Sequence, residues 1–255
     1  MTARPIEVAA GHADGAKRFY DSCLVVIPAA NQEKTIFRVV SELRDRGFKY
    51  IRVIDTGSVD STALRARAAG AEVAREQLCG FGRSCPRGLD KIPHGIAWIL
   101  FCNGDGSDDP SNLEALLAET EDADLVLGNR TAWDGARLDV QRFGNWILSK
   151  LVHRGWGVRF AAFGTLRLVR REALDAIGMR HHGSGWNVVM QIRAIEARLK
   201  IREVPVRPRV RQSRRSTFER TIADAASVAG AILQAVARLY FGGDRTTATG
   251  RDEAL

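Results

Sequence analysis

The stretch Cys23-Leu-Val-Val-Ile-Pro28 is an unbroken apolar run that ends at a proline, and an amphipathic pattern over residues 33–46 follows it. A short apolar run without alternation is typical of a strand that is buried on both faces. Apolar residues at intervals of three and four are typical of a helix. We therefore predict a buried strand followed by a helix that packs against it.

The same order of strand and helix recurs along the chain. The predicted strands after the first are 51–54, 72–74, 97–102, 123–127, 165–169 and 201–206, and the further predicted helices are 61–69, 86–92, 110–119, 143–153, 186–198 and 218–240. Alternation of this kind is typical of a sheet whose crossover helices cover both faces. The sequence therefore predicts an α/β fold with a mostly parallel sheet.

The length of 255 residues fits one large domain, and no linker or internal repeat divides it. We expect a loose N-terminal arm over residues 1–20 and a main domain over 21–217. A C-terminal amphipathic helix follows over 218–241, and residues 242–255 form a frayed tail.

The chain carries 38 cationic and 30 acidic residues, which gives a formal net charge of +8, and only six of the cations are lysines. This balance is compatible with an anionic partner, although an arginine-rich composition is equally typical of a GC-rich genome. The basic segment 207–220 beside the last helix could attract anionic lipid headgroups, and the alternative is a solvated charged face.

The cysteines show no paired spacing and the first twenty residues hold no apolar signal segment, so we expect a reduced, cytoplasmic compartment. The longest uncharged stretch near the end, residues 225–237, is shorter than the roughly 17–25 residues of a membrane span. The expected location is the cytoplasm, with a peripheral position on the inner face of the membrane as an option.

Polar residues gather where the predicted strands end, in segments 28–31, 55–60, 103–109 and 128–130. In open α/β sheets, ligands bind at the carboxyl ends of the strands. These segments are therefore the candidate binding site.

Three motifs follow one another at these strand ends: Val26-Ile-Pro-Ala-Ala-Asn-Gln-Glu33, Val53-Ile-Asp-Thr-Gly-Ser-Val-Asp-Ser-Thr62 and Phe101-Cys-Asn-Gly-Asp-Gly-Ser-Asp-Asp-Pro110. In this order they resemble a family 2 glycosyltransferase. The chain is most similar to the branch of dolichol-phosphate mannose synthase and the bacterial polyprenyl-phosphate glycosyltransferases, from about residue 23 to about residue 240.

The resemblance implies a GT-A fold, a nucleotide-diphosphate sugar as donor, and a polyprenyl phosphate as one acceptor. It implies that the nucleotide sugar contacts Pro28, Ala30, Asn31, Asp55, Gly57, Arg83, Asn103, Gly104 and Asp105. It implies catalytic roles for Asp105, Arg130 and Arg142, and contacts to an acceptor phosphate for Arg142, Arg167 and Arg214. Mg²⁺ or Mn²⁺ would be held by Asp105 and Asn103.

Physical chemistry fits these roles. Asp55 at a strand end can accept hydrogen bonds from a base, and Gly57 allows a sharp turn beneath it. A divalent cation near Asp105 would bridge diphosphate oxygens, and arginine forks suit phosphates. The structural alternatives are that Asp55 only caps the next helix and that residues 103–110 are a plain turn.

The chain departs from the family pattern at four positions where acids are usual, which here are Gln32, Asn103, Ala162 and Val189. Amides keep an oxygen that can bind a metal but lose its charge, so weak metal binding is expected. Asp108 or Asp109 is a candidate replacement ligand. Two hypotheses follow: a transferase with an altered pocket, which we favour, and a protein of this fold that binds a nucleotide sugar or a partner without transfer.

Three other classes fit less well. A nucleotidyltransferase needs a Gly-rich basic loop after the first strand, and a Rossmann dehydrogenase needs G-x-G-x-x-G there; residues 28–32 contain neither. Aromatic residues are not interleaved with arginines, so no nucleic-acid partner is expected. The sequence leaves the oligomeric state open.

Overall fold

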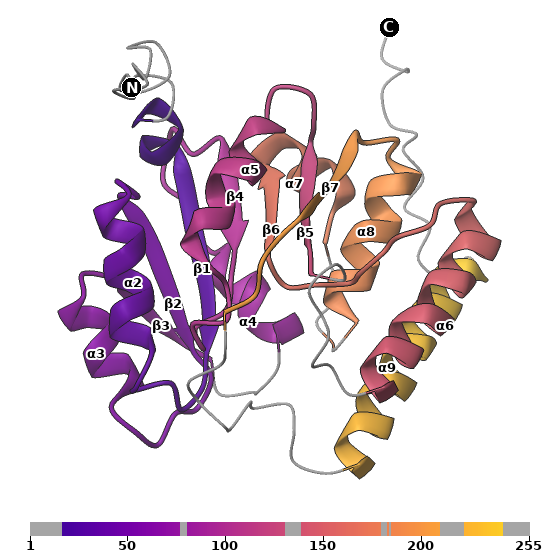
Figure 1. Ribbon diagram of the computed structural model, residues 1–255, viewed down its shortest axis with the longest axis horizontal. Coiled ribbons are helices and arrows are strands. Elements are labelled where there is room, and N and C mark those ends of the chain that lie inside the picture. Colours follow the sequence, from indigo (N-terminus) through magenta and orange to yellow (C-terminus); the bar gives the residue numbers. More distant parts are fainter. Residues whose placement is uncertain are drawn as a thin grey trace, which may run out of the picture.

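The computed structural model describes residues 17–76, 81–130, 139–179, 183, 185–209 and 222–241, without side-chain detail for 81, 83, 139–143 and 222–229. Within these residues one seven-stranded sheet has the order β3-β2-β1-β4-β6-β5-β7 (Figure 1). The strands are β1 (Cys23–Ala29), β2 (Tyr50–Asp55), β3 (Glu72–Arg75), β4 (Trp98–Phe101), β5 (Leu125–Asn129), β6 (Arg167–Arg170) and β7 (Ile201–Pro205).

Helices cover both faces of this sheet. They are α2 (Ile36–Asp45), α3 (Thr62–Ala68), α4 (Phe81–Gly88), α5 (Leu113–Ala118), α6 (Asp139–Trp156), α7 (Arg171–Ile177), α8 (Trp186–Glu196) and α9 (Ile222–Tyr240), with a 3₁₀ turn η1 (Pro110–Asn112) before α5. The predicted α/β class with helices on both faces is therefore confirmed.

The two faces of the sheet hold separate hydrophobic cores. Along β1, Leu24 and Val26 point into the core beneath α4, α7 and α8, whereas Val25 and Ile27 point into the core beneath α2 and α5. Successive side chains of a strand point to opposite faces, so both sets must be apolar when both faces are covered. This explains why the strand reads as a continuous apolar run.

Strand direction decides where the loops go. β1 pairs in parallel with β2 and β4, β2 with β3, and β5 with β7. β6 is antiparallel to both β4 and β5, so it is the reversed strand of a mostly parallel sheet, and β5 runs in the direction of β4. The carboxyl ends of the other six strands therefore share one edge.

The helix that follows β3 differs from the prediction over 86–92, because α4 begins at Phe81 and has Pro86 inside it. Tertiary packing explains the shift. A Cβ on Gly82 would lie 1.7 Å from the carbonyl oxygen of Gly183, and a Cβ on Gly88 would lie 2.3 Å from Val26 Cγ1. The two glycines let this helix lie directly on its neighbours.

Two further elements depart from expectation. Residues 17–20, predicted as part of a loose arm, are helical, and Phe19 and Tyr20 pack against the core beneath α2. Helix α7 was not predicted; it buries Ala173, Leu174 and Ile177 directly after β6. Both segments are short and are stabilised by a few apolar contacts with the core. So few apolar residues give only a weak periodic pattern in the sequence.

The last helix belongs to the folded unit. Ala235, Val236 and Leu239 of α9 are buried in the core that also holds residues of α6 and α8. In the described part of the chain, none of the helices has the length and apolar character needed to cross a bilayer. Residues 210–221, which include most of the basic segment, and residues 242–255 lie outside the described residues.

Candidate active site

The turn after β1 is bonded to the turn after β2. The backbone amide of Asn31 donates to Ser58 Oγ at 3.0 Å, and Asn31 Oδ1 accepts from the Val59 amide at 3.0 Å. Asn31 and Gly57 have positive φ angles of 52° and 77°, a conformation that glycine adopts freely and asparagine tolerates. The two turns therefore form one continuous wall at the sheet edge.

Asp55 ends β2 at this wall and is 3% exposed. Its Oδ1 accepts from the Ser58 amide at 3.0 Å, and its Oδ2 lies 4.0 Å from Arg75 Nε. Helix α3 begins only at Thr62, with Ser61 as its N-cap. Asp55 therefore fixes its own turn and does not cap the following helix.

Asp60 fastens the same wall from the other side. It accepts from the Glu33 amide at 3.2 Å and from the Thr62 amide at 2.9 Å, and it also bonds the Thr62 hydroxyl. Burial by itself raises the pKa of the Asp60 carboxyl, but these hydrogen bonds outweigh it and the pKa is lowered. The ionised carboxylate is thus part of the loop structure.

The loop after β4, residues 102–109, carries the acidic motif, and we call it the acidic loop. The Asn103 amide donates to Asp108 Oδ2 at 2.7 Å, and the Ser107 amide donates to Asp105 Oδ1 at 2.9 Å. Gly104 of this loop is buried, and a Cβ at this position would lie only 3.1 Å from Ala29 Cβ. The loop is therefore packed against the end of β1 and folds back on itself.

Arg130, just after β5, reaches this loop. Its Nη2 pairs with Asp108 Oδ1 and lies 3.3 Å from Ser107 Oγ. The side chains of Arg130 and Asp108 are 12% and 11% exposed. A cation and the acidic loop therefore meet at the sheet edge, and Asp108 is occupied as the partner of Arg130.

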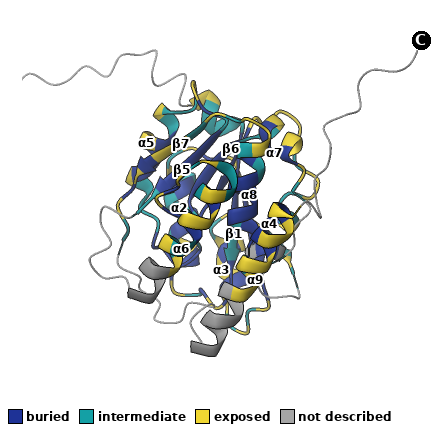
Figure 2. Ribbon diagram, turned by 90° about the vertical axis from the view of Figure 1, so that its right-hand side faces the viewer, coloured by how far each residue is buried: buried dark blue, intermediate teal, exposed yellow. Residues whose placement is uncertain are grey.

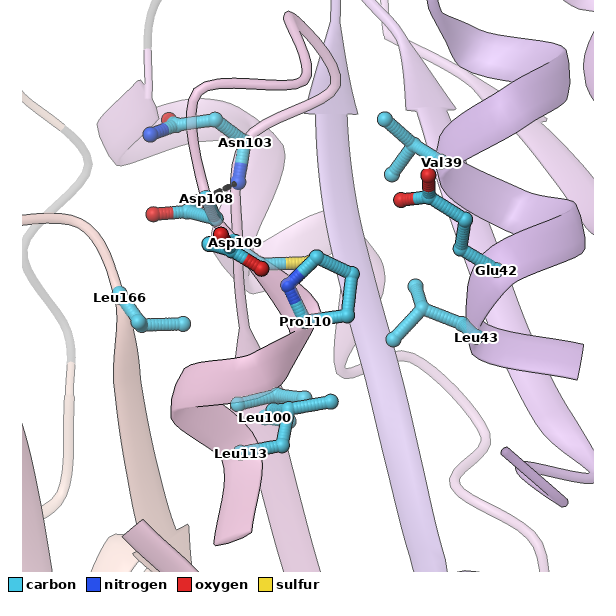
Figure 3. A pocket seen from close by; sticks show the side chains of 11 residues that line it. Val39, Glu42, Leu43, Leu100, Asn103, Asp108, Asp109, Pro110, Leu113 and Leu166 are labelled. Atoms are coloured by element: carbon cyan, nitrogen blue, oxygen red, sulfur yellow. Dashed lines mark hydrogen bonds between the residues drawn. The ribbon is translucent and has the colours of Figure 1, made fainter. Parts of the chain in front are cut away.

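A small pocket lies between this loop and α2. Figure 3 shows Asn103, Asp108 and Asp109 on one side of the pocket and Val39 and Glu42 of α2 on the other, above an apolar floor; the side chains of Asn103 and Asp108 point away from α2. The floor is formed by Leu43, Leu100, Cys102, Leu113 and Leu166.

Arg209 bridges the rim of this pocket. Its Nη1 donates to both carboxylate oxygens of Glu42 at 2.9 and 2.8 Å, and its Nη2 lies 3.4 Å from Asp109 Oδ1. Burial opposes the charge on Arg209, but the two acids raise its pKa. Burial likewise opposes the charge on Asp109, and its bonds to Ser111 and Arg209 lower its pKa.

The segment after β7 is clipped to the acidic loop by backbone bonds. Asn112 Nδ2 donates to the Arg207 carbonyl at 2.8 Å, and Asn112 Oδ1 accepts from the Arg207 amide at 2.9 Å. The Arg209 amide donates to the Ser107 carbonyl at 2.9 Å. Residues far apart in the sequence therefore hold this loop in place.

Three of the four residues that stand in place of family acids lie inside the protein, and Asn103 is partly exposed. Gln32 is 5% exposed, and its Oε1 accepts from Thr35 Oγ1 at 3.2 Å. Ala162 and Val189 are each 5% exposed. Glu203 bonds the Ala161 amide at 3.1 and 3.2 Å. Burial raises the pKa of Glu203 although amide hydrogen bonds oppose the shift.

Arg167 does not lie where a phosphate could reach it, which corrects the expectation. The residue is 0% exposed, and it donates to the Asn187 carbonyl at 3.2 Å and to the Gly164 carbonyl. Burial lowers its pKa to about 10, an effect that Cys85 opposes. The guanidinium on reversed strand β6 is thus directed into the core.

The other predicted site residues fall into two groups. Pro28 and Ala30 lie at the end of β1, so the structure brings them together with Asn31, Asp55 and Gly57 at one wall. For three predicted arginines the side chain or the whole residue lies outside the described part of the chain: Arg83 in α4, Arg142 in α6 and Arg214.

Few side chains at this site could bind a divalent metal. Asp105 supplies a carboxylate, and Asn103 supplies an amide oxygen while its Nδ2 donates to Thr165 Oγ1 at 2.6 Å. Among the described residues, no group of three His, Cys, Asp or Glu side chains gathers as a metal site. Mg²⁺ and Mn²⁺ commonly take one or two carboxylates and complete their coordination with substrate phosphates and water, so these residues fit a metal that arrives with a diphosphate.

Sequence reasoning missed the residues that hold the acidic loop. Arg209, Glu42, Asn112 and Thr165 carry no motif, and their contacts join segments as much as 167 positions apart. The sequence singled out Arg209 only as part of the basic segment 207–220 after a predicted strand, which does not identify its partners.

Similarity to known proteins identifies the family and the fold of this chain. Residues 24–178 match the family described as Glycosyl transferase family 2. An uncharacterised glycosyltransferase of Mycobacterium tuberculosis is 30% identical over 188 residues, which cover 73% of this chain and 84% of the relative. An undecaprenyl-phosphate mannosyltransferase of Micrococcus luteus is 25% identical over 198 residues, which cover 72% and 82%.

Among solved structures, glucosyl-3-phosphoglycerate synthase of M. tuberculosis, in complex with Mn²⁺, UDP-glucose and phosphoglyceric acid, has a TM-score of 0.72 at 22% identity. The match covers 94% of this chain and 86% of the synthase. The sheet order and this likeness define a GT-A fold. The chain belongs to glycosyltransferase family 2, and it is an enzyme that uses a nucleotide-sugar donor.

Proposed function

We propose that this enzyme transfers a sugar from a nucleotide-diphosphate sugar to a polyprenyl phosphate. The observation that carries the proposal is that Arg130 reaches the loop that carries Asp105, through its contacts with Asp108 and Ser107, beside the wall that holds Asp55. A base-binding acid, a metal-binding acid and a phosphate-binding cation are the three groups that such a donor requires.

The wall after β1 and β2 binds the nucleoside. Asp55, held by the Ser58 amide, presents a carboxylate to the hydrogen-bond donors of a base. The fixed turns at Asn31 and Gly57 leave little conformational freedom to lose when the donor binds.

Arg130 stabilises the negative charge that grows on the departing diphosphate. Its pairing with Asp108 and its contact with Ser107 orient the guanidinium before the donor arrives. Charge stabilisation by groups that are already in position contributes strongly to catalysis, because no reorganisation is needed during the reaction.

A divalent metal fits the same loop. Asp105 and the Asn103 amide oxygen would hold it, and when bound it supplies charge neutralisation to the diphosphate. With one carboxylate in the set, we expect weak affinity for Mg²⁺ or Mn²⁺ alone and stronger affinity with the donor.

The acceptor proposal rests on two supports. A lipid phosphate is anionic near neutral pH and can attack without a protein base, which agrees with Val189 standing where the family often has an acid. A relative over most of the chain is named an undecaprenyl-phosphate mannosyltransferase. An acceptor of this kind would bring the enzyme to the inner face of the cytoplasmic membrane.

The test has two stages. Calorimetry with a panel of nucleotide diphosphates and their sugars, with Mn²⁺ and with chelator, identifies the donor. Transfer from that donor is then measured to undecaprenyl phosphate in detergent and to soluble phosphorylated acids. We expect a lipid-linked product, and loss of at least about a hundredfold in rate for Asp105→Asn, because a metal-binding charge is removed.

The matched control is Asp122→Asn, which removes an exposed carboxylate in the turn after α5 and should leave the rate unchanged. Transfer only to a soluble phosphorylated acid would overturn the acceptor proposal. Tight donor binding without transfer to any acceptor would instead favour the hypothesis of a protein of this fold that binds without catalysis.

A further inference from the structure

Helices α6 and α9 lie side by side at one end of the molecule, on the outside of α8 (Figure 1). Their carboxyl ends are adjacent, because the Tyr240 ring packs on Trp156 at a centroid distance of 6.0 Å and also contacts Gly155. The helices therefore run in the same direction. Figure 2 looks onto this layer and shows exposed residues along both helices.

The outer surface of this layer is rich in apolar side chains. Trp146 and Leu151 of α6 are 53% and 39% exposed, and Leu233 and Tyr240 of α9 are 44% and 50% exposed. Phe241, directly after α9, is 84% exposed. Most of the large exposed hydrophobic side chains in the described residues belong to this group, which we call the α6/α9 face.

The described charged side chains of the α6/α9 face are all basic. Residues 144–156 and 230–241 contain no aspartate or glutamate, whereas Lys150, Arg154 and Arg238 are exposed there. Lys150 Nζ lies 3.9 Å from the centroid of the Trp146 ring. Glu196 of α8 lies at the edge of this face, where it accepts from Trp156 Nε1 at 3.0 Å and lies 3.6 Å from Arg193.

This combination fits one kind of partner. Tryptophan and tyrosine have an apolar body and a polar edge and are enriched where a bilayer meets water. Lysine and arginine lay their apolar stems along such a surface and keep their charge at headgroup level. Single exposed apolar side chains are common on protein surfaces, but a group of them marks an interaction site. A partner with apolar and anionic layers matches both halves of the composition.

We infer that the α6/α9 face docks on an anionic lipid bilayer, with Trp146, Leu233 and Phe241 entering the headgroup boundary. The basic residues above them then lie against lipid phosphates. The inference rests on the exposed side chains themselves and gives the proposed lipid acceptor a defined side of the enzyme.

The test is co-sedimentation of the full chain with phosphatidylcholine vesicles and with vesicles in which phosphatidylglycerol replaces part of that lipid. We expect binding to the anionic vesicles, weakened at least about tenfold by Leu233→Glu and by Trp146→Glu. Leu64→Glu is the matched control, because Leu64 is 68% exposed on α3 and the substitution changes the net charge equally. It should bind like the wild type.

Two results would overturn the inference. One is vesicle binding that Leu233→Glu and Trp146→Glu leave unchanged, or no vesicle binding at all. The other is a wild-type dimer in analytical ultracentrifugation that the same two substitutions dissociate, which would show that a second copy covers the α6/α9 face.

The proposed function can fail separately. Vesicle binding is measured without donor or acceptor, and transfer is measured in detergent without vesicles. If the protein binds vesicles but transfers only to soluble acids, the docking inference stands and the lipid acceptor is rejected. If it transfers to undecaprenyl phosphate but does not bind vesicles, the lipid acceptor stands and the docking inference is rejected.

Discussion

At the scale of single residues, short polar side chains hold the turns of the candidate site in place by bonding backbone amides. Asn31 and Asp60 each accept from a backbone amide of the neighbouring turn, and Asp55 accepts from an amide of its own turn. Gln32, in place of a family acid, bonds Thr35 inside the protein. The chain has thus exchanged a charge near the donor wall for an internal hydrogen bond, while the wall itself is kept.

Asp60 provides a test at this scale. Its lowered pKa means that the folded protein binds this proton less tightly than the unfolded chain does, so the carboxylate stabilises the fold above the unfolded pKa. This stabilisation is lost as the pH falls below about 4, where an ordinary aspartate protonates, towards the lower folded pKa. We expect the free energy of unfolding, measured in urea, to fall more steeply over this pH range for the wild type than for Asp60→Asn.

The control for Asp60 is Asp175→Asn on α7, an exposed carboxylate that pairs with Arg171 at 2.9 Å within its own helix. Exposed helix pairs of this kind contribute little to stability. Equal pH slopes for the wild type and Asp60→Asn would show that the Asp60 bonds add no net stability.

At the scale of elements, the site depends on the segment that follows β7. Residues 206–209 bond Asn129, Asn112, Ser107 and Glu42, which belong to four separate parts of the chain. The acidic loop is therefore held on one side by Arg130 and on the other by Arg209. Loss of either contact should loosen the loop that carries Asp105.

Arg209→Gln tests this dependence. We expect about a tenfold loss of affinity for the nucleotide diphosphate that the wild type binds most tightly, equivalent to about 1.4 kcal/mol. Arg209→Lys should recover only part of it, because an ammonium group cannot bridge Glu42 and Asp109 with the same fork. Calorimetry measures both values.

Arg202→Gln on β7 is the control, because Arg202 is exposed and pairs with Glu119 at 3.7 Å, away from the loop. A fall in melting temperature for Arg209→Gln with unchanged nucleotide affinity would contradict the role in positioning and leave a structural role only.

At the scale of the whole molecule, the C-terminal helix α9 contributes side chains to the hydrophobic core. Leu239 is 5% exposed and packs in the core beneath α6 and α8, whereas Leu233 on the same helix is 44% exposed. One helix therefore serves both the folded core and the α6/α9 face.

Leu239→Ala should lower the free energy of unfolding by about 2–5 kcal/mol, the usual cost of a cavity in a core. Leu233→Ala should change it by less than about 0.5 kcal/mol, as is usual for an exposed position. Urea unfolding of the full chain measures both. Similar small effects at the two positions would mean that α9 is only loosely attached.

Much of this architecture could be predicted from the sequence because its cause is local. The apolar run at Cys23–Ala29 must be buried on both faces, and positions of most strands agree with the prediction within two residues. The sequence predicted helix α4 at the wrong position and did not predict α7. Contacts of Gly82, Gly88 and Leu174 with distant segments set the bounds of these two helices.

The sequence by itself determined the α/β class, the family and the loops that form the site, because hydrophobic periodicity and short motifs are properties of neighbouring residues. Only the tertiary structure decided that β6 is reversed, that Arg167 points into the core, and that Arg209 meets Glu42. These depend on the packing of segments that lie far apart in the chain. The polar contacts of Arg167 and Arg209 join residues from different elements, and no local pattern in the sequence records such pairings.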